Sequence, residues 1–300
     1  MHEAVRIDGE IRRLDNPVLV ASFSGWSDSG GAASATMEYL IAEWNASPLA
    51  HLDSEAFYDF TVQRPRVRLE DGERVLDWPE NKLYVARPPG ASRDFVLLDG
   101  VEPHLRWRTF NLAIEELMRE LGVETSITLG AQPAGVPHTR PLPVNLSASH
   151  PDFEDIFKLK APASRYQGPT GIVGVMNLHH RNLGWRNASL WGLVPHYLTL
   201  GPNPNAMLSL VRTLDVGFGL QTSTTQLQAR IEEFAGQVAQ ALRQSPEAAG
   251  YVTQLEEQYD EERPAAPLAA EEPASEELPA TEDILNDLEK FFREQQGPNS

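Results

Sequence analysis

Cysteine is absent from the 300 residues of the chain. Disulfide bonds, thiolate nucleophiles and thiolate zinc sites are therefore excluded, and the composition is compatible with a reducing cytosol. No apolar run approaches the ~20 residues that a helix needs to cross a bilayer. The N-terminal stretch MHEAVRIDGEIRRL also lacks the apolar core of a signal peptide. We therefore expect a cytoplasmic protein without a membrane partner.

Positive charge is scarce as well. The chain carries 25 Lys and Arg against 43 Asp and Glu, which gives a net charge of −18. Non-specific nucleic-acid binding needs clustered Lys and Arg to neutralise phosphates, and the sequence shows no such cluster. Both nucleic acids and anionic membrane surfaces are thus excluded as partners on charge grounds.

The acidic residues are concentrated near the C-terminus. Residues 255–300 hold 14 acidic and three basic residues, which account for −11 of the net charge. Within them, residues 260–280 consist largely of Pro, Ala and Glu and predict a solvated linker. Residues 281–296 predict a short amphipathic helix, with Thr281 as its cap. We expect this helix to dock on its own body, on a neighbouring subunit or on a partner through Ile284, Leu285, Leu288, Phe291 and Phe292.

The body, residues 1–259, alternates between strand and helix patterns. The predicted strands cover residues 18–23, 83–87, 95–98, 126–129, 172–176 and 190–194, and a hairpin turns at Asp71 and Gly72. The predicted helices cover residues 31–44, 105–121, 206–214, 224–243 and 247–259. Apolar strands interleaved with amphipathic helices indicate an α/β sheet covered on both sides.

The loop GWSDSGG, which follows the first of these strands, is the first candidate site. A strand, a glycine-rich turn and a helix N-terminus can bind an anion, which makes Gly25, Ser29, Gly30 and Gly31 candidate ligand-binding residues. The loop matches neither a Walker motif nor a dinucleotide fingerprint, and Asp28 would repel phosphate. The simpler interpretation is that Asp28 or Ser29 caps the helix.

The same loop is similar to a hydrolase nucleophile elbow. Gly25-x-Ser27-x-Ser29 has serine where the G-x-S-x-G motif has its second glycine, in the required strand-to-helix position. A serine nucleophile needs a general base, so this hypothesis requires His138 or His196 to reach Ser27. The candidate catalytic residues are therefore Ser27, Asp28, His138 and His196.

A second polar loop, LGAQPAGVPHTRPLPV, follows the strand predicted at residues 126–129. His138, Thr139 and Arg140 lie between prolines at a strand end, where α/β sheets bind their ligands. They could hold a carboxylate or polarise a carbonyl. We favour the structural alternative, in which His138 and Arg140 tie the loop to backbone carbonyls or to acidic residues such as Asp28.

Metal ligands are not spaced as a metal site requires. His179 and His180 are adjacent, so on a helix they would point about 100° apart. No H-E-x-x-H or carboxylate–histidine spacing is present. We expect neither a metal nor another cofactor.

Five segments, taken in order, resemble the proteasome assembly chaperone 2 family in its actinobacterial branch. They are GWSDSGGAASATMEYL, GAQPAGVPHTRPLPV, GPTGIVGVMN, SLWGLVPHYL and NPNAMLSLVRTL, and the resemblance runs from about residue 18 to about residue 255. It implies a three-layer α/β/α sandwich similar to the phosphorylase/hydrolase-like fold, followed by C-terminal helices.

The resemblance also implies a function. Archaeal and eukaryotic relatives are proteasome assembly chaperones or similar proteins that often form oligomers. We therefore expect a chaperone-like, non-enzymatic protein that self-associates and has proteasome-related or other assembly partners. Proteasome-binding relatives end in a hydrophobic residue, a tyrosine and one more residue, whereas this sequence ends Gly297-Pro298-Asn299-Ser300. The alternative is a small-ligand-binding protein or hydrolase/phosphorylase-like enzyme with a cleft near Ser27, Asp28, His138 and Arg140.

Overall fold

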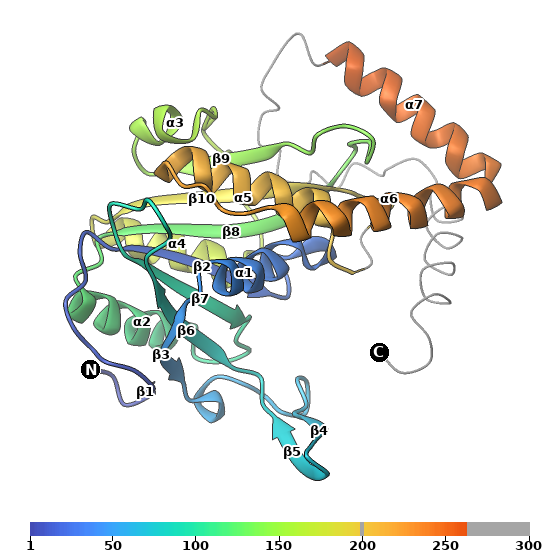
Figure 1. The fold of residues 1–300 in the computed structure, drawn as a ribbon. Coiled ribbons are helices and arrows are strands. Elements are labelled where there is room, and N and C mark those ends of the chain that lie inside the picture. Colours follow the sequence, from blue (N-terminus) through green and yellow to red (C-terminus); the bar gives the residue numbers. More distant parts are fainter. Residues whose placement is uncertain (199–200, 263–300) are drawn as a thin grey trace.

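A mixed sheet of eight strands forms the centre of the computed structural model, which describes residues 1–198 and 201–262 (Figure 1). The strand order is β1-β3-β6-β7-β2-β8-β10-β9. Four neighbouring strands, β7, β2, β8 and β10, run parallel, and β1, β3, β6 and β9 pair antiparallel with their neighbours. The strands are β1 Val5–Ile7, β2 Val18–Ser24, β3 Ser47–Leu52, β6 Asn81–Ala86, β7 Phe95–Val101, β8 Thr125–Ala134, β9 Val144–Ala148 and β10 Arg186–Pro195.

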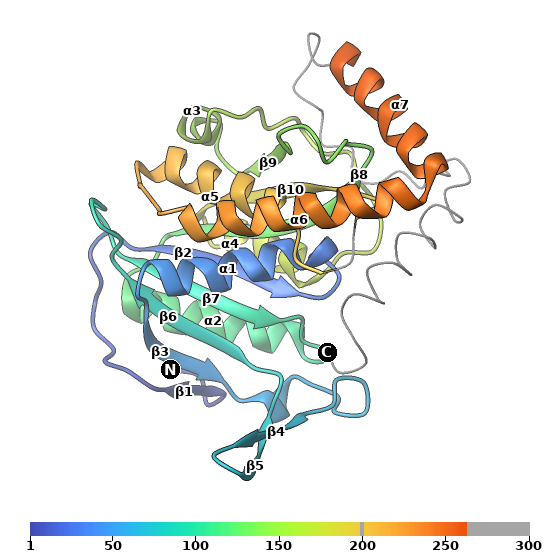
Figure 2. The same ribbon diagram turned by 45° about the vertical axis from the view of Figure 1, so that its right-hand side comes forward.

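Helices cover both faces of the sheet. On one face, α1 (Ala32–Glu43) and α5 (Pro204–Phe218) bury an apolar core with β2, β8 and β10, and α3 (Asp152–Phe157) packs on α5 (Figure 2). On the other face, α2 (Trp107–Leu121) and α4 (Ile172–Asn182) enclose a second core that includes Leu19, Phe23 and Leu98. The predicted three-layer α/β/α sandwich is confirmed.

Most of the predicted elements are present. The strands expected at residues 18–23, 83–87, 95–98, 126–129 and 190–194 correspond to β2, β6, β7, β8 and β10. The hairpin turns at Asp71 and Gly72, both with positive φ, between β4 (Arg66–Glu70) and β5 (Glu73–Asp77). The short strands β1, β3 and β9 and the helix α3 were not expected.

The strand predicted at residues 172–176 is wrong, because these residues begin helix α4. The run Ile-Val-Gly-Val is β-branched enough to be typical of a strand. Ile172, Val173 and Met176 nevertheless lie at helical spacing, and all three are buried against α2 and the sheet. The Glu102 carboxylate accepts the Ile172 backbone N–H at 2.7 Å and so caps the first turn, which is a tertiary contact that local sequence does not reveal.

Two helices complete the described chain. Helix α6 (Thr225–Gln244) crosses α5, and α7 (Pro246–Glu262) follows after a single residue. Helix α7 continues three residues beyond the boundary expected at residue 259. The predicted helix over residues 281–296, with its five apolar residues, lies outside the described residues. None of the described helices combines the length and apolarity needed to cross a bilayer.

Candidate functional site

A cavity of about 510 Å³ opens beside α4 at the carboxyl ends of β2 and β8. Its rim includes Gly25, Ser27, Asp28 and Ser29 from the loop after β2. Strands β7 and β8 lie on opposite sides of β2, so the connections that leave these strands run in opposite directions along the sheet at this point. Such a switch point is where open α/β sheets bind their ligands.

Asp28 fixes the shape of the loop after β2. Its carboxylate accepts hydrogen bonds from the Ala33 backbone N–H at 2.7 Å and from the Ser34 hydroxyl at 2.5 Å, in the first turn of α1. Burial raises the pKa of Asp28, while the hydrogen bonds from Ser34 and Ala33 oppose this shift. The Asp28 side chain therefore satisfies an N–H group in the first turn of α1, although the N-cap residue is Gly31 and not Asp28 or Ser29, the residues that the sequence predicted. Gly30 and Gly31 adopt positive φ angles of 58° and 57° at the turn into this helix.

Glu102 joins this loop to α4. One carboxylate oxygen accepts the Trp26 backbone N–H at 3.2 Å, and the other caps α4. A Cβ atom at Gly171 would lie 2.8 Å from the Ser27 hydroxyl oxygen and 2.8 Å from the Glu102 carboxylate, so a larger residue here would displace one of these side chains. The Glu102 carboxylate and the close contact at Gly171 therefore fix the entrance of the cavity.

The sheet face beneath α4 is polar. In β8, β10 and β9 the side chains alternate, and one set of residues packs in the apolar core with α1 and α5. The opposite set faces α4 and consists of Ser126, Thr128, Gly130, Gln132, Asn187, Ser189, Trp191, Asn145 and Ser147. A sheet covered on both sides normally buries apolar residues on both faces. The face beneath α4 departs from this pattern, because Ser126, Thr128 and Asn187 are polar and fully buried.

Part of this polar face is sealed under α4 as a hydrogen-bonded network. The Nδ1 atom of His180 lies 2.9 Å from the Ser126 hydroxyl, and the Asn187 amide donates to the Asn177 carbonyl oxygen at 2.7 Å. Thr128 continues the network to Asn177. Burial, with a smaller contribution from the charge of His179, lowers the pKa of His180 to about 3, so this ring is neutral at physiological pH. Asn177 reaches the wall of the cavity, where the network ends.

His138 and His196 take part in a different cluster, which fastens α7 to the body. The Nδ1 atom of His138 lies 2.8 Å from the Tyr197 hydroxyl. His196 donates from Nδ1 to the Ala134 carbonyl at 3.1 Å and accepts from the Tyr251 hydroxyl at Nε2 at 3.0 Å. Burial lowers the pKa of both histidines. Both rings are thus neutral members of a packing contact.

Thr139 and Arg140 belong to the same contact. Arg140 donates through Nε and one terminal nitrogen to both oxygens of Asp260 on α7, at 3.0 and 2.8 Å, and Thr139 donates to Glu256. The loop was expected to be tied to acidic side chains such as Asp28, and the acidic side chains are instead those of α7.

The structure separates the candidate residues into two groups. Gly25, Ser27, Asp28 and Ser29 line the cavity, whereas neither His138, His196 nor Arg140 does. Ser27 is 4% exposed, and none of the described residues forms a hydrogen bond with its hydroxyl. The serine hypothesis therefore has its nucleophile at the cavity and its candidate bases in the α7 contact.

Sequence reasoning missed the wall of the cavity. The missed residues are Trp26, Gln132, Ser147, Tyr166, Asn177, Arg181, Ser189 and Trp191. Strict alternation of polar and apolar residues in NASLW and in SITLG was the available signal, because such a strand has one polar face.

Metal ligation has no support in residues 1–198 and 201–262. No group of three or more His, Asp or Glu side chains is placed there so that it could hold a metal ion. The hydrogen-bond donors and acceptors of the cavity suit an organic ligand instead.

Comparisons with known proteins connect this architecture to a family. The model of the PAC2 family matches residues 22–242. A PAC2 family protein from Streptomyces avermitilis is 40% identical, with a TM-score of 0.72, and the match covers 79% of this chain and 99% of that one. A proteasome-assembly chaperone homologue from Mycobacterium tuberculosis is 38% identical, with a TM-score of 0.70, covering 78% and 99%.

A more distant solved structure shares the fold. The archaeal proteasome activator PbaB from Pyrococcus furiosus is 17% identical, with a TM-score of 0.65, and the match covers 79% of this chain and 97% of that one. No curated protein matches the sequence.

Proposed function

Because this chain belongs to the PAC2 family, we propose that it is a chaperone-like, non-enzymatic interaction protein with proteasome-related partners. The observation that carries the proposal is its 38% identity to the proteasome-assembly chaperone homologue of Mycobacterium tuberculosis, across 99% of that chain.

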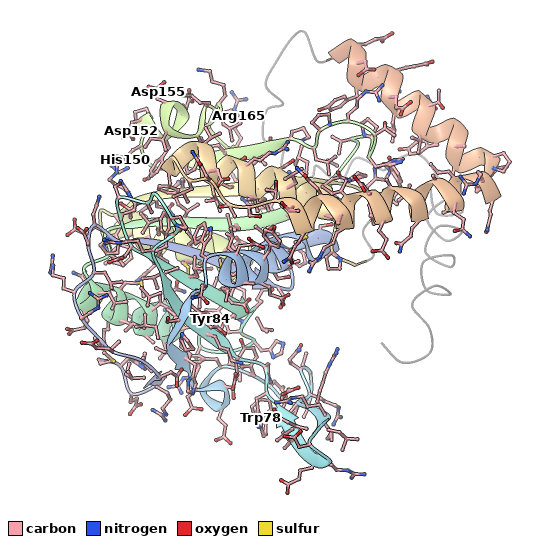
Figure 3. The ribbon with its side chains drawn as sticks, in the orientation of Figure 1. Trp78, Tyr84, His150, Asp152, Asp155 and Arg165 are labelled. Atoms are coloured by element: carbon pink, nitrogen blue, oxygen red, sulfur yellow. The ribbon has the colours of Figure 1, made fainter. Side chains whose placement is uncertain are left out.

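Self-association is part of the proposal, and the β4–β5 hairpin is its candidate contact. The hairpin projects from the body beyond Trp78 (Figures 1 and 3). Val67 and Leu76 are directly paired, and Leu69 lies on the same face two residues along the strand. These three side chains are 61%, 51% and 72% exposed. A two-stranded hairpin is marginally stable alone in water, so an apolar face of this kind is stabilised by a partner surface.

A second copy of the chain is the occupant that charge favours. Arg64 and Arg66, at the start of the hairpin, pair with no carboxylate of the described residues, whereas Arg68 is paired with Glu70 and Asp77. Carboxylates of an acidic second copy can pair with these two arginines, and the apolar face then buries its three side chains.

The test measures the oligomeric state of the protein and its binding to proteasome components. Purified full-length protein is expected to be oligomeric by light scattering and to bind purified proteasome particles or their unassembled subunits. A triple variant, V67S/L69S/L76S, is expected to be monomeric, while the matched change Glu73→Ser on the opposite face leaves the oligomer intact. A wild-type protein that is monomeric and binds no proteasome component would contradict the proposal.

The cavity supports a second candidate function, which is binding of a small ligand with or without hydrolase or phosphorylase-like chemistry. Its Ser27 hydroxyl faces the cavity and has no protein partner in the described ranges. A serine without an adjacent base is a weak nucleophile, so ligand binding has more support than hydrolysis.

A further inference from the structure

We propose that the cavity beside α4 binds a small aromatic carboxylate, with its ring against Trp26 and Trp191 and its carboxylate on Arg181. The inference rests on the second candidate function and names its ligand class. It is independent of the chaperone-like role, since binding is measured on the purified protein without any proteasome component.

Two indoles from different elements line the cavity. The Trp26 side chain is 71% exposed, although its backbone is held in place by Glu102. The Trp191 ring lies over Gly130 of the adjacent strand, where a Cβ atom would be only 2.7 Å from the ring. Both indoles line the cavity, as does Tyr166. Exposed rings with a fixed backbone favour stacking of a planar apolar group.

The polar wall offers fixed hydrogen-bonding groups. Ser27 and Ser189 are 4% and 3% exposed, and both line the cavity. Ser189 already accepts a hydrogen bond from Thr128 at 2.8 Å, whereas the Ser27 hydroxyl has no partner among the described residues. The Ser27 oxygen keeps contact with the cavity, so it can form a hydrogen bond with a ligand there.

Arg181 supplies the positive charge. It lies at the last turn of α4, donates to the Ser147 hydroxyl at 3.4 Å, and forms an ion pair with no carboxylate of the described residues. A guanidinium beside a hydroxyl is suited to bind a carboxylate. Because Arg181 is the only cation that lines the described cavity, a singly charged carboxylate fits better than a phosphate dianion.

The charges are arranged along the cavity. Asp28 lines the end beside the loop after β2, and Glu102 lies behind that loop, so both repel an anion there. Arg181 lies ten residues along α4 from Gly171, which corresponds to about 15 Å of helix. An anionic group is therefore directed to the Arg181 end and a neutral ring towards Trp26. The volume of about 510 Å³ is within the range of small-ligand pockets.

Calorimetric titration of the full-length protein tests the ligand class. The probes are N-acetyl-L-tryptophan, its carboxamide, which lacks the charge, and N-acetylglycine, which lacks the ring. We expect the acid to bind at least about tenfold more tightly than the carboxamide, since a charge-assisted hydrogen bond is lost, and N-acetylglycine to give no measurable binding. The proposal would be overturned if N-acetyl-L-tryptophan at millimolar concentration gave no heat of binding. It would also be overturned if the protein bound the acid and the carboxamide with equal affinity.

Single substitutions test whether Arg181 binds the carboxylate and Trp26 binds the ring. Arg181→Gln is expected to remove the preference for the acid, so that both tryptophan probes bind with equal affinity. The matched control Arg212→Gln, at an exposed arginine of α5 on the opposite side of the sheet, is expected to retain the preference. Trp26→Ala is expected to lower the affinity for both tryptophan probes by about tenfold, because one stacking contact is lost. Retention of the preference by Arg181→Gln, or undiminished binding by Trp26→Ala, would refute the assignment.

Discussion

Replacing His180 by glutamine should reduce the loss of stability that occurs as the pH falls. His180 is fully buried, its ring stacks on Trp185 at 4.6 Å, and burial lowers its pKa from 6.5 to about 3. The unfolded chain therefore binds a proton near pH 6.5 while the folded chain does not. Protonation stabilises the unfolded state as the pH falls from about 6.5 towards 3, so stability is lost on acidification.

The size of this effect follows from the difference between the pKa of His180 in the unfolded and in the folded chain. One pH unit corresponds to about 1.36 kcal/mol, so between pH 7 and pH 5 His180 alone lowers the free energy of unfolding by about 2 kcal/mol. Urea unfolding of wild type and His180→Gln at pH 7, 6 and 5 measures it. The variant is expected to be less stable at pH 7, because the Ser126 contact is weakened, and to lose about 2 kcal/mol less on acidification.

Ser126→Ala is the matched control for this prediction. It removes the same hydrogen bond, which joins Ser126 to His180 at 2.9 Å, but retains the titrating ring. Its stability should be lower at every pH, with the pH dependence of wild type. If His180→Gln and wild type lose the same free energy between pH 7 and pH 5, the neutral buried histidine is not the source of the effect.

Three further changes test the body. Gly130→Ala should cost about 1–3 kcal/mol in urea unfolding, since the new methyl group meets the Trp191 ring at 2.7 Å; an unchanged midpoint would refute this crowding. Arg140→Ala should speed hydrogen exchange throughout α7 and change the stability of the body by less than about 1 kcal/mol, because this ion pair is at the surface; unchanged exchange in α7 would contradict it. Glu102→Ala should cost about 1–3 kcal/mol and speed exchange in the first turn of α4, and full protection there would argue against the cap.

Patterns that are local in sequence predicted much of the fold. The helix over residues 105–121 and the hairpin turn at Asp71 and Gly72 each depend on residues within a few positions, and both are present. Helix α4 was predicted as a strand because its β-branched start outweighed its spacing. The contact that decides its conformation comes from Glu102, 70 residues earlier in the chain.

The candidate site was predicted in part. The loop after β2 could be found because a strand, a glycine turn and a helix follow one another in sequence. Arg181 and Trp191 could not be found in this way, since their shared cavity depends on which strands are neighbours in the sheet. His138 and Arg140 looked like site residues because they are polar and follow a strand. The partner of His138 is Tyr197, 59 residues later, and that of Arg140 is Asp260 on α7, 120 residues later.

The polar face beneath α4 also affects how the body opens. The first half of α4 is held by apolar burial of Ile172, Val173 and Met176, whereas Asn177 and His180 in the second half rest on hydroxyl and amide groups. Hydrogen bonds to such groups can be exchanged for water at little net cost, unlike apolar contacts. Among the layer helices, α4 should therefore detach by a sub-global fluctuation at lower free energy than α1 or α2. That fluctuation would uncover the polar strands, so the same residues that shape the cavity would also set how often its floor is exposed to solvent.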